Sequence, residues 1–423
     1  MKFSICNLGC KVNAFEAESI ASVMEGKGWT RVPFEEAADA VLIFTCAVTN
    51  MAASKSRKMM HRARRLNKDA IICMTGCYAE VDEGMLEDAE IIAGTRYKKN
   101  VPLYIDAYMQ NHEKIRVRGE LEHIPFDNME AEQFENRTRA YLKVQDGCNQ
   151  FCSYCIIPYA RGRERSMEPD LVIAEAKRLA ANYPEIVLAG IHTGRYGREY
   201  GLTLAQLMKR ILEEVPALQR LRISSIEMTE IDDEMIELIK HEPRIARHLH
   251  IPLQSGCDSV LRRMNRPYTT DQYYDKITMI RHEIEDIAIS CDLITGFPME
   301  SEEEFQQTCD FLNKCGFSFL HVFPYSVRKG TPAATMQGQI DPRIKKERTK
   351  ICMDISKHLE VAYMQSYLNK DTEVIFETEE DGYVKGHSSQ YFPVYAKDVP
   401  LHRGVERVKL VKFEDGKLFG ELV

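Results

Sequence analysis

The chain has 423 residues, of which 44% are hydrophobic and 28% charged, and its formal net charge at pH 7 is −8. A chain of this length usually forms two or three domains, and its net charge excludes a protein that is basic throughout, although a local basic surface can still bind nucleic acid. No apolar run approaches the roughly 18 residues that a membrane span requires, and the first residues lack the apolar core of a secretory signal. We therefore expect a cytoplasmic protein that binds no membrane.

Residues 1–106 are expected to fold as repeated strand and helix units. Strands are predicted at Lys2–Cys6, Ala40–Thr45 and Ala70–Thr75. A helix is predicted from about Asn13 to Lys27, with Asn13 as N-cap and Glu16 completing a capping box. Units of this kind form a small parallel sheet with helices on its faces. The first domain is therefore predicted to be of the α/β class.

Three cysteines, Cys10, Cys46 and Cys77, fall just past these predicted strands. Because ligands gather at the carboxyl ends of parallel strands, the three thiols could meet at one edge of the sheet and share a metal cluster. Cysteine is also commonly buried as a small apolar residue, so the pattern alone leaves both interpretations open. Thirteen cysteines in such a chain favour metal sites or reduced thiols over disulfides, and Cys6 and Cys73, inside strands, are expected in the core.

A basic run without any acidic residue lies between the second and third predicted strands. This run, Ser54–Lys68, contains the candidate RNA contacts Lys55, Arg57, Lys58, Arg62 and Arg65. A helix with charges of a single sign is often only a solvated face, but it is also what contacts with RNA phosphates require. Both interpretations remain open from the sequence.

Residues 107–137 are charged and lack a clear period, so we expect a linker with one short strand. Strands and helices then alternate over residues 138–340. The predicted strands are Ala140–Gln145, Glu185–Gly190, Arg220–Ser225, His248–Leu253, Ile287–Ile294 and Phe319–Phe323. The predicted helices are Glu168–Tyr183, Thr203–Val215, Asp232–His241, Ser259–Arg266, Asp271–His282 and Ser301–Cys315. This alternation indicates a partial (β/α)6 barrel with right-handed crossovers, shorter than a complete TIM barrel.

The most informative stretch follows the first of these strands. It places Cys148, Cys152 and Cys155 at the spacing C-x3-C-x2-C, with Gly147 leading in. One short loop can present these thiols to a 4Fe-4S cluster, and since such clusters normally take four cysteines, one iron stays open for chemistry. A structural zinc site usually requires a second pair of ligands, and none flanks this loop, so the spacing favours the cluster. Chemistry in barrels of this kind lies on the loops after the strands.

Small and polar residues follow the other strands and could hold a nucleoside cofactor. The candidate cofactor-binding residues are Gly190, His192, Ser225, Glu227, Gln254 and Asp292. Small residues permit close backbone approach, and Glu227 and Gln254 could reach ribose hydroxyls or an amino group. Each residue alone is equally consistent with ordinary turn chemistry, so the prediction depends on their joint occurrence.

After a charged helix over residues 341–368, the composition shifts to strands in residues 369–423. The predicted strands are Thr372–Thr378, Tyr383–His387, Tyr391–Ala396, Val405–Phe413 and Lys417–Leu422. A small five-stranded antiparallel barrel fits this pattern, and such barrels often hold oligonucleotides. The aromatic residues Tyr391, Phe392 and Tyr395 are expected to form its core, although exposed rings could stack on bases.

Several motifs together resemble the radical S-adenosylmethionine methylthiotransferases, which modify tRNA or a ribosomal protein. They are Leu8–Asn13, Thr45–Thr49, Thr75–Tyr78, the cysteine loop, His250–Gly256, Met264–Thr269 and Phe323–Ser326. The resemblance implies two 4Fe-4S clusters, an S-adenosylmethionine site that includes Tyr154, and a C-terminal TRAM domain that grips tRNA. The clusters would be held by Cys148, Cys152 and Cys155 and by Cys10, Cys46 and Cys77. The Gly-Cys-Lys-Val-Asn form, with Tyr78 and the Phe-Pro-Tyr-Ser-x-Arg segment, is most similar to the branch acting on N6-threonylcarbamoyladenosine beside the anticodon.

The resemblance also implies a mechanism. A 5′-deoxyadenosyl radical from S-adenosylmethionine would remove hydrogen from C2 of the adenine, and the second cluster would present a sulfur methylated beforehand. We expect a reducing electron donor of the flavodoxin or ferredoxin type, whereas the sequence does not identify the sulfur donor. One position departs from the family: Phe44 stands where the family usually has Asn, a polar neighbour of the second cluster.

Two alternatives remain. A methylthiotransferase of another branch would act on an isopentenyl-type adenosine or on an aspartate of a ribosomal protein. A protein of a different class would be an iron-sulfur RNA-binding redox module without turnover. The mass of the modified nucleoside separates the branches, and formation of 5′-deoxyadenosine separates an enzyme from a redox module.

Overall fold

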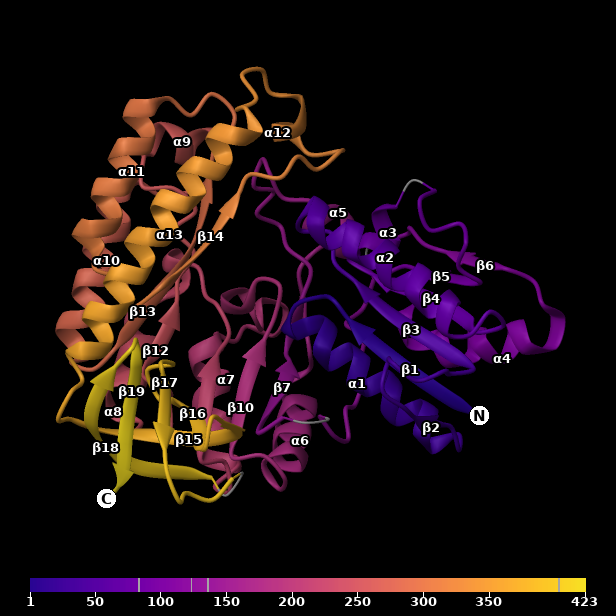
Figure 1. Cartoon of the computed structure of the whole chain (residues 1–423), viewed down its shortest axis with the longest axis horizontal. Helices are drawn as coiled ribbons and strands as arrows, with labels where there is room; N and C mark the ends of the chain where they lie inside the picture. The colour runs from indigo at the N-terminus through magenta and orange to yellow at the C-terminus, as the bar shows by residue number, and fades with distance from the viewer. Residues whose placement is uncertain (83, 123, 135–136, 402–403) are drawn as a thin grey trace.

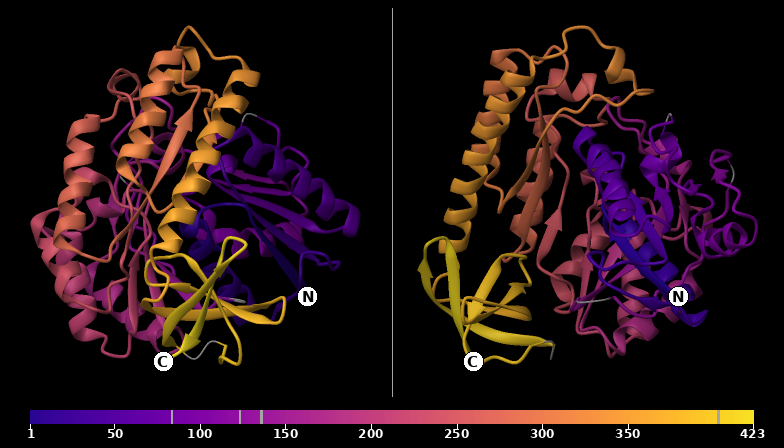
Figure 2. Two further views of the ribbon diagram at one scale, coloured as in Figure 1. Left: turned by 60° about the vertical axis from the view of Figure 1, so that its left-hand side comes forward. Right: turned by 45° about the vertical axis from the view of Figure 1, so that its right-hand side comes forward.

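Three folded units follow one another in the computed structural model, which describes residues 1–82, 84–122, 124–134, 137–401 and 404–423. Figures 1 and 2 show an N-terminal α/β domain, a central partial barrel of parallel strands and a small C-terminal β-barrel. The predicted fold class is confirmed. Within the described chain, no helix is both long and apolar enough to cross a bilayer.

The N-terminal sheet has six parallel strands in the order β2-β1-β3-β4-β5-β6. They are β1 (Lys2–Asn7), β2 (Thr30–Arg31), β3 (Ala40–Thr45), β4 (Ile71–Gly76), β5 (Ile91–Ala93) and β6 (Ile115–Val117). The predicted strands are β1, β3 and β4. The others have two or three residues, too few for a sequence period, so only their pairing defines them. β6 lies in the predicted linker 107–137, of which residues 123, 135 and 136 lie outside the described residues.

Helices cover both faces of this sheet. They are α1 (Lys11–Gly26), α2 (Asn50–Leu66), α3 (Cys77–Val81), the 3-10 turn η1 (Lys98–Asn100) and α4 (Val101–Asn111). Alternate residues of β3 divide between two cores. Leu42 and Phe44 belong to the core that includes α1 and α4, whereas Val41 and Ile43 belong to the core that includes α2. This is the two-residue period of a strand buried on both faces.

The start of α1 differs from the prediction. The helix begins at Lys11 with Cys10 as N-cap, and no side chain caps it. Asn13 and Glu16 are 1% and 0% exposed. The Nδ2 group of Asn13 donates to the carbonyl of Thr45 at 3.0 Å, and Glu16 accepts from buried cations. The predicted capping box is therefore wrong, because tertiary contacts use both side chains.

The six parallel strands of the central unit form the predicted partial (β/α)6 barrel. They are β7 (Arg139–Lys143), β10 (Glu185–Ala189), β11 (Arg220–Ile223), β12 (His248–His250), β13 (Ala288–Thr295) and β14 (Leu320–Pro324). They pair as β7-β10-β11 and β12-β13-β14. A parallel bridge between Leu221 and Ile245 joins the two halves, so the carboxyl ends of all the strands lie on one side.

The crossover helices lie outside the barrel strands in Figure 1. They are α6 (Pro169–Ala180), α7 (Leu204–Glu214), α8 (Asp233–His241), α9 (Asp258–Arg263), α10 (Thr270–Glu283) and α11 (Glu302–Cys315). Shorter elements are β8 (Gln145–Asp146), β9 (Arg165–Ser166), α5 (Ile157–Arg161), α12 (Pro332–Thr335) and the turns η2 (Thr193–Arg195), η3 (Arg198–Tyr200) and η4 (Met228–Glu230). The long helix α13 (Pro342–Gln365) covers the edge strand β14, where Oγ of Ser356 accepts from the N–H of Leu320 at 3.0 Å.

The C-terminal strands close into a barrel in the order β15-β16-β17-β19-β18. They are β15 (Asp371–Glu380), β16 (Tyr383–Ser388), β17 (Pro393–Ala396), β18 (Val405–Glu414) and β19 (Lys417–Leu422). The β17–β19 pair is parallel, and the other pairs are antiparallel. The predicted five-stranded antiparallel barrel is therefore confirmed except for this one parallel pair. Strand directions cannot alternate around a closed ring with an odd number of strands, so one pair has to be parallel.

The three aromatic residues predicted for the barrel core do not all pack inside the barrel. Phe392 belongs to the core cluster, and Tyr395, 5% exposed, packs against Phe419 with ring centroids 5.8 Å apart. Tyr391 leaves the barrel instead and stacks on His248 of β12 with ring centroids 5.1 Å apart. The core prediction was therefore wrong for Tyr391, because its ring packs against His248 of the central unit instead of against the barrel core.

A buried arginine connects the central and C-terminal barrels. Arg222 is 3% exposed, and its Nε donates to Oε1 of Glu185 at 2.8 Å. Its Nη1 and Nη2 donate to the carbonyls of Ser389 and Ser388 at 3.1 and 3.3 Å. Each nitrogen of the guanidinium thus has a partner, and two of the partners are backbone atoms of the C-terminal barrel.

Replacing Arg222 with Ala is expected to loosen the C-terminal barrel. The change leaves Glu185, which is 1% exposed, without its closest cation, and breaking a buried pair costs about 3–5 kcal/mol. We expect faster hydrogen exchange in β15 and β16 and a lower midpoint of urea unfolding. Arg407→Ala is the control, since the Arg407–Asp371 pair is exposed and worth about 0–1 kcal/mol. Equal effects of the two changes would contradict this role of Arg222.

Candidate active site

The loop after β8 brings Cys148, Cys152 and Cys155 together. All three are free thiols. Burial raises the pKa of Cys155 to about 12, with the neighbouring thiols of Cys152 and Cys148 adding to the rise. Bound iron would reverse this shift, because a metal ion deprotonates a coordinating thiol. Gly147, with a φ of 71°, turns the chain into the loop.

Hydrogen-bond donors surround these sulfurs. Nη1 of Arg266 lies 3.3 Å from Sγ of Cys152. The N–H of Gln150 donates to Sγ of Cys148 at 3.4 Å, and Nδ1 of His192 lies 3.4 Å from the same sulfur. Burial would lower the pKa of His192, but its hydrogen bonds to Cys148 and to a nearby glutamate raise that pKa to about 10. Donors of this kind stabilise a thiolate, the form of cysteine that binds metal.

The donor set of the loop fits a 4Fe-4S cluster. Three thiols with donors to sulfur, and no fourth cysteine in the loop, fit a cluster with one open iron.

A cavity of about 230 Å³ opens beside the loop. Its walls include the loop cysteines and the predicted residues Tyr154, His192, Ser225, Glu227, Gln254 and Asp292. Gly190 lines a neighbouring cavity instead. Glu227 forms an ion pair with Arg266, a residue that the sequence reasoning did not assign. Its signal was the segment Met264–Thr269, which contributed to the resemblance without indicating a role for any one residue.

The second set of cysteines lies at the carboxyl ends of neighbouring strands. Cys10, Cys46 and Cys77 follow β1, β3 and β4. Burial raises the pKa of Cys77 to about 12, and the nearby Cys10 and Cys46 add to the rise. Nε of Arg161 donates to Sγ of Cys77 at 3.1 Å. The fold thus brings three thiols that are distant in sequence to one edge of the sheet, whereas Cys73 lies in a hydrophobic core and Cys6, partly buried, packs against one.

The departure at Phe44 has a structural explanation. Phe44 is fully buried in the core on the α1 side of the sheet. The polar group beside the second cysteine set comes from Asn13, whose Nδ2 donates to the carbonyl of Thr45 at 3.0 Å. Oδ1 of Asn13 accepts from Arg161. Phe44 therefore stabilises the sheet, and Asn13 supplies the amide next to Cys46.

A buried ion network lies behind both cysteine sets. Its Lys98, Lys143, Arg161, Glu16 and Asp146 side chains are all 0% exposed. Nζ of Lys98 and of Lys143 each lie 2.7 Å from Oε1 of Glu16. Nη1 of Arg161 lies 3.0 Å from Glu16 and 2.9 Å from Oδ1 of Asp146. Burial would raise the pKa of Glu16, but the cations Arg161, Lys143 and Lys98 lower it.

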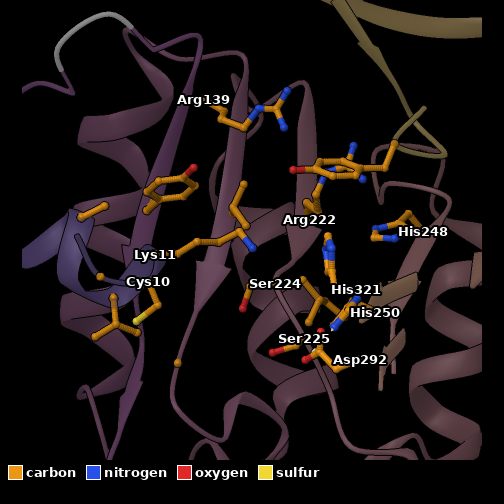
Figure 3. A pocket seen from close by; sticks show the side chains of 18 of the residues that line it. Cys10, Lys11, Arg139, Arg222, Ser224, Ser225, His248, His250, Asp292 and His321 are labelled. Atoms are coloured by element: carbon orange, nitrogen blue, oxygen red, sulfur yellow. Dashed lines mark ion pairs between the residues drawn. The ribbon is translucent and has the colours of Figure 1, made fainter. Parts of the chain in front are cut away.

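A second cavity, of about 440 Å³, lies between the N-terminal domain, the central barrel and the C-terminal barrel. Figure 3 shows Cys10 and Lys11 on one side of it and His250 and Asp292 on the other. The seam cavity, as we call it, shares Ser225 and Asp292 with the cavity of the loop. Cys10 of the second cysteine set and the three loop cysteines therefore face adjoining cavities.

Helix α2 presents most of the predicted RNA contacts to solvent. The exposed side chains are Lys55, Lys58, Arg62 and Arg65. Arg57 is half-buried, and its Nη1 donates to the hydroxyl of Tyr78 at 2.8 Å. The basic face is thus available along α2 except at Arg57, which is held against the second cysteine set.

Two parts of the chain match known protein families, and one of these matches includes the cysteine loop. Residues 142–312 match the radical SAM superfamily, and residues 2–94 match an uncharacterized protein family, UPF0004. The solved structure of the cobalamin-dependent S-adenosylmethionine radical enzyme OxsB has the same fold, with a TM-score of 0.52 and 12% identity over 84% of this chain and 55% of that chain. The barrel and its cysteine loop are those of a radical SAM enzyme, and this superfamily implies a 4Fe-4S cluster and S-adenosylmethionine.

Two relatives are similar along most of the sequence. The threonylcarbamoyladenosine tRNA methylthiotransferase MtaB of Bacillus subtilis is 41% identical over 96% of this chain and 92% of its own length. The tRNA-2-methylthio-N(6)-dimethylallyladenosine synthase of Clostridium botulinum is 31% identical over 89% of this chain and 86% of its own. The chain belongs to the radical SAM methylthiotransferase family.

Replacing Gly147 with Ala is expected to disturb the cysteine loop. An L residue is strained at a φ of 71°, and an added Cβ would lie 1.9 Å from the carbonyl oxygen of Arg163, so the backbone has to shift. After anaerobic reconstitution, we expect iron per chain to fall below the wild-type value, because the distorted loop would no longer hold its cluster. Gly382→Ala is the control, since its φ is 77° but nothing lies near the added Cβ. Full iron in Gly147→Ala would contradict the argument.

Replacing Glu16 with Gln is expected to weaken the contact between the first two units. The change removes one of two carboxylates from a buried group of cations, and breaking such a pair costs about 3–5 kcal/mol. Hydrogen exchange in α1 and the midpoint of urea unfolding measure the loss. Asp106→Asn breaks an exposed pair with Lys27 and is expected to cost about 0–1 kcal/mol. A loss for Glu16→Gln no larger than that of the control would mean that the network contributes little.

Proposed function

We propose that this enzyme adds a methylthio group at C2 of N6-threonylcarbamoyladenosine, beside the anticodon of tRNA. The observation that carries the proposal is that the loop cysteines and Cys10 of the second set line adjoining cavities with Ser225 and Asp292 in common. A reaction that takes a hydrogen from one carbon and leaves sulfur on it needs both reagents within reach of one base. The 41% identity to the Bacillus subtilis methylthiotransferase supports the choice of nucleoside.

The two cysteine sets would hold two 4Fe-4S clusters. Cys148, Cys152 and Cys155 would bind the cluster whose open iron takes S-adenosylmethionine, and Cys10, Cys46 and Cys77 would bind the other. When bound, these groups supply one-electron cleavage of the sulfonium, which allows a C–H bond to be broken, and the sulfur that replaces the hydrogen. Three thiols in each set and a donor to sulfur in each, Arg266 and Arg161, support this assignment.

Residues around the loop cavity would orient the cofactor. Arg266 contacts Sγ of Cys152 at 3.3 Å and forms an ion pair with Glu227, so the carboxylate is held at the cavity wall. Nε of Arg266 donates to the hydroxyl of Tyr268 at 3.1 Å, and that hydroxyl donates to the carbonyl of Pro252 at 2.9 Å. This chain of contacts fixes Glu227 for a ribose hydroxyl or an amino group, the role expected from the sequence.

RNA would be held by two regions outside the cavities. The exposed cations of α2, which are Lys55, Lys58, Arg62 and Arg65, suit phosphate contacts, and the C-terminal barrel is consistent with a TRAM domain.

The reaction also requires a reducing donor of the flavodoxin or ferredoxin type and a sulfur donor of unknown identity. A tRNA substrate places the enzyme in the cytoplasm. The dimethylallyladenosine branch is the second candidate, which the 31% identity to the Clostridium enzyme favours.

Anaerobic reconstitution of two triple variants tests the cofactor assignment. The Cys148→Ala/Cys152→Ala/Cys155→Ala protein is expected to keep about half of the wild-type iron and to form no 5′-deoxyadenosine. The Cys10→Ala/Cys46→Ala/Cys77→Ala protein is expected to lose a similar share of iron and still cleave S-adenosylmethionine. Wild-type iron in the first triple would contradict the loop assignment.

The mass of the modified nucleoside tests the substrate. Reconstituted wild-type enzyme is expected to convert N6-threonylcarbamoyladenosine in tRNA to its 2-methylthio form. A 2-methylthio form of the dimethylallyl nucleoside would select the second candidate. Absence of 5′-deoxyadenosine under reducing conditions with RNA present would indicate a redox module instead of an enzyme.

A further inference from the structure

The seam cavity contains a cation that no carboxylate of the protein neutralises at contact distance. Lys11 comes from the first turn of α1, directly after Cys10, and its side chain points into the cavity in Figure 3. Among the described residues, Lys11 has neither an ion pair nor a hydrogen bond. A partly buried ammonium group is costly unless an anion joins it, so this position favours an anionic ligand.

Three arginines also line the seam cavity. The exposed Arg137 donates from Nη1 to the hydroxyl of Tyr141 at 2.8 Å, and its guanidinium lies over that ring. The other two are paired with carboxylates. Arg222 binds Glu185 and the backbone of the C-terminal barrel. Arg139 forms an ion pair with Glu377. These arginines therefore hold the two barrels together, whereas the ammonium of Lys11 remains available for a ligand.

A second unused polar group lies on the opposite wall. His248 is 5% exposed, its Nε2 lies 2.8 Å from Oγ of Ser290, and its Nδ1 has no partner among the described residues. The ring of His248 contacts those of Tyr391 and Phe319, with ring centroids 5.1 and 5.7 Å away, and these two rings also contact each other, with centroids 6.1 Å apart. Burial and the charge of Arg222 keep the pKa of His248 well below its usual range, so the ring is neutral. A neutral imidazole nitrogen of this kind suits a hydroxyl group of a ligand.

We propose that the seam cavity selects the threonylcarbamoyl group, with Lys11 binding its carboxylate and His248 facing its hydroxyl. This inference rests on the proposed function and names the residues that would choose its substrate. A threonylcarbamoyl group carries one carboxylate and one hydroxyl, and a dimethylallyl group carries neither. An apolar group here would bury the ammonium of Lys11 and Nδ1 of His248 without partners, which excludes it more strongly than lost contact alone.

The position of the cavity supports this role. Cys10 of the second cysteine set lines it, and Ser225 and Asp292 are common to it and the loop cavity. A substituent on N6 that is bound by Lys11 would therefore keep its adenine at the junction of the two cavities. Substrate selection and placement of the base between the cysteine sets would then depend on the same contact.

Binding of anticodon stem-loop RNAs to the reconstituted full-length enzyme tests the inference. Three RNAs differ only at the target base, which is N6-threonylcarbamoyladenosine, adenosine or N6-dimethylallyladenosine. We expect Lys11→Gln to weaken binding of the first RNA by about 10- to 150-fold, the range for a hydrogen bond to a charged group, and to leave the other two within about 2-fold. Lys11→Arg is expected to keep part of the preference, and Lys209→Gln, an exposed change on α7, all of it.

Several outcomes would overturn the inference. Equal weakening of all three RNAs by Lys11→Gln would mean that Lys11 contacts a backbone phosphate, and an unchanged preference would mean that it contacts neither group. Iron content and visible absorbance of Lys11→Gln report whether the neighbouring Cys10 still binds its cluster. His248→Ala provides an independent variant, expected to lower affinity for threonylcarbamoyl RNA several-fold and not for adenosine RNA. A wild-type enzyme that fails to modify threonylcarbamoyl tRNA would instead overturn the proposed function.

Discussion

The arrangement of this protein depends on one buried ion network between the N-terminal domain and the central barrel. Two carboxylates, Glu16 and Asp146, lie among four cations, Lys98, Lys143, Arg161 and Arg165. Charges removed from water are costly unless every group has partners, and here the partners come from both units. Separating the units would leave buried charges unpaired, so the network permits only one relative placement of the two cysteine sets.

The same network places positive charge beside the second cysteine set. Its four cations exceed its two carboxylates, and the excess positive charge reaches Sγ of Cys77 through Arg161, at 3.1 Å. A thiolate or an anionic cluster at that position balances the excess. Asp146 lies two residues before Cys148, so a single set of charges lies behind both cysteine sets. The charges that lie beside Cys77 therefore also hold the segment that leads into Cys148.

The C-terminal barrel takes part in the site as well as in the proposed grip on RNA. Tyr391 stacks on His248 at 5.1 Å, and Arg222 binds the carbonyls of Ser388 and Ser389. These contacts connect the C-terminal barrel to a wall of the seam cavity. In the proposed function, binding of the RNA strand by this barrel would therefore be mechanically coupled to placement of one base. The N-terminal domain supplies the facing wall through Lys11, so all three units meet around the seam cavity.

The sequence by itself determined the strands of the central barrel and the cysteine loop, because buried parallel strands are apolar runs bounded by turns and the C-x3-C-x2-C spacing is local. It also placed the second cysteines at strand ends. It could not assign Asn13 and Glu16, whose capping pattern is overridden by partners such as Lys143, 127 residues from Glu16. Nor could it assign the stacking of Tyr391 on His248 or the place of Lys11 in the wall of the seam cavity, since both depend on units that meet only in the folded chain. Tertiary structure decided those roles, because the free energy of a buried charge or ring is set by whatever packs against it.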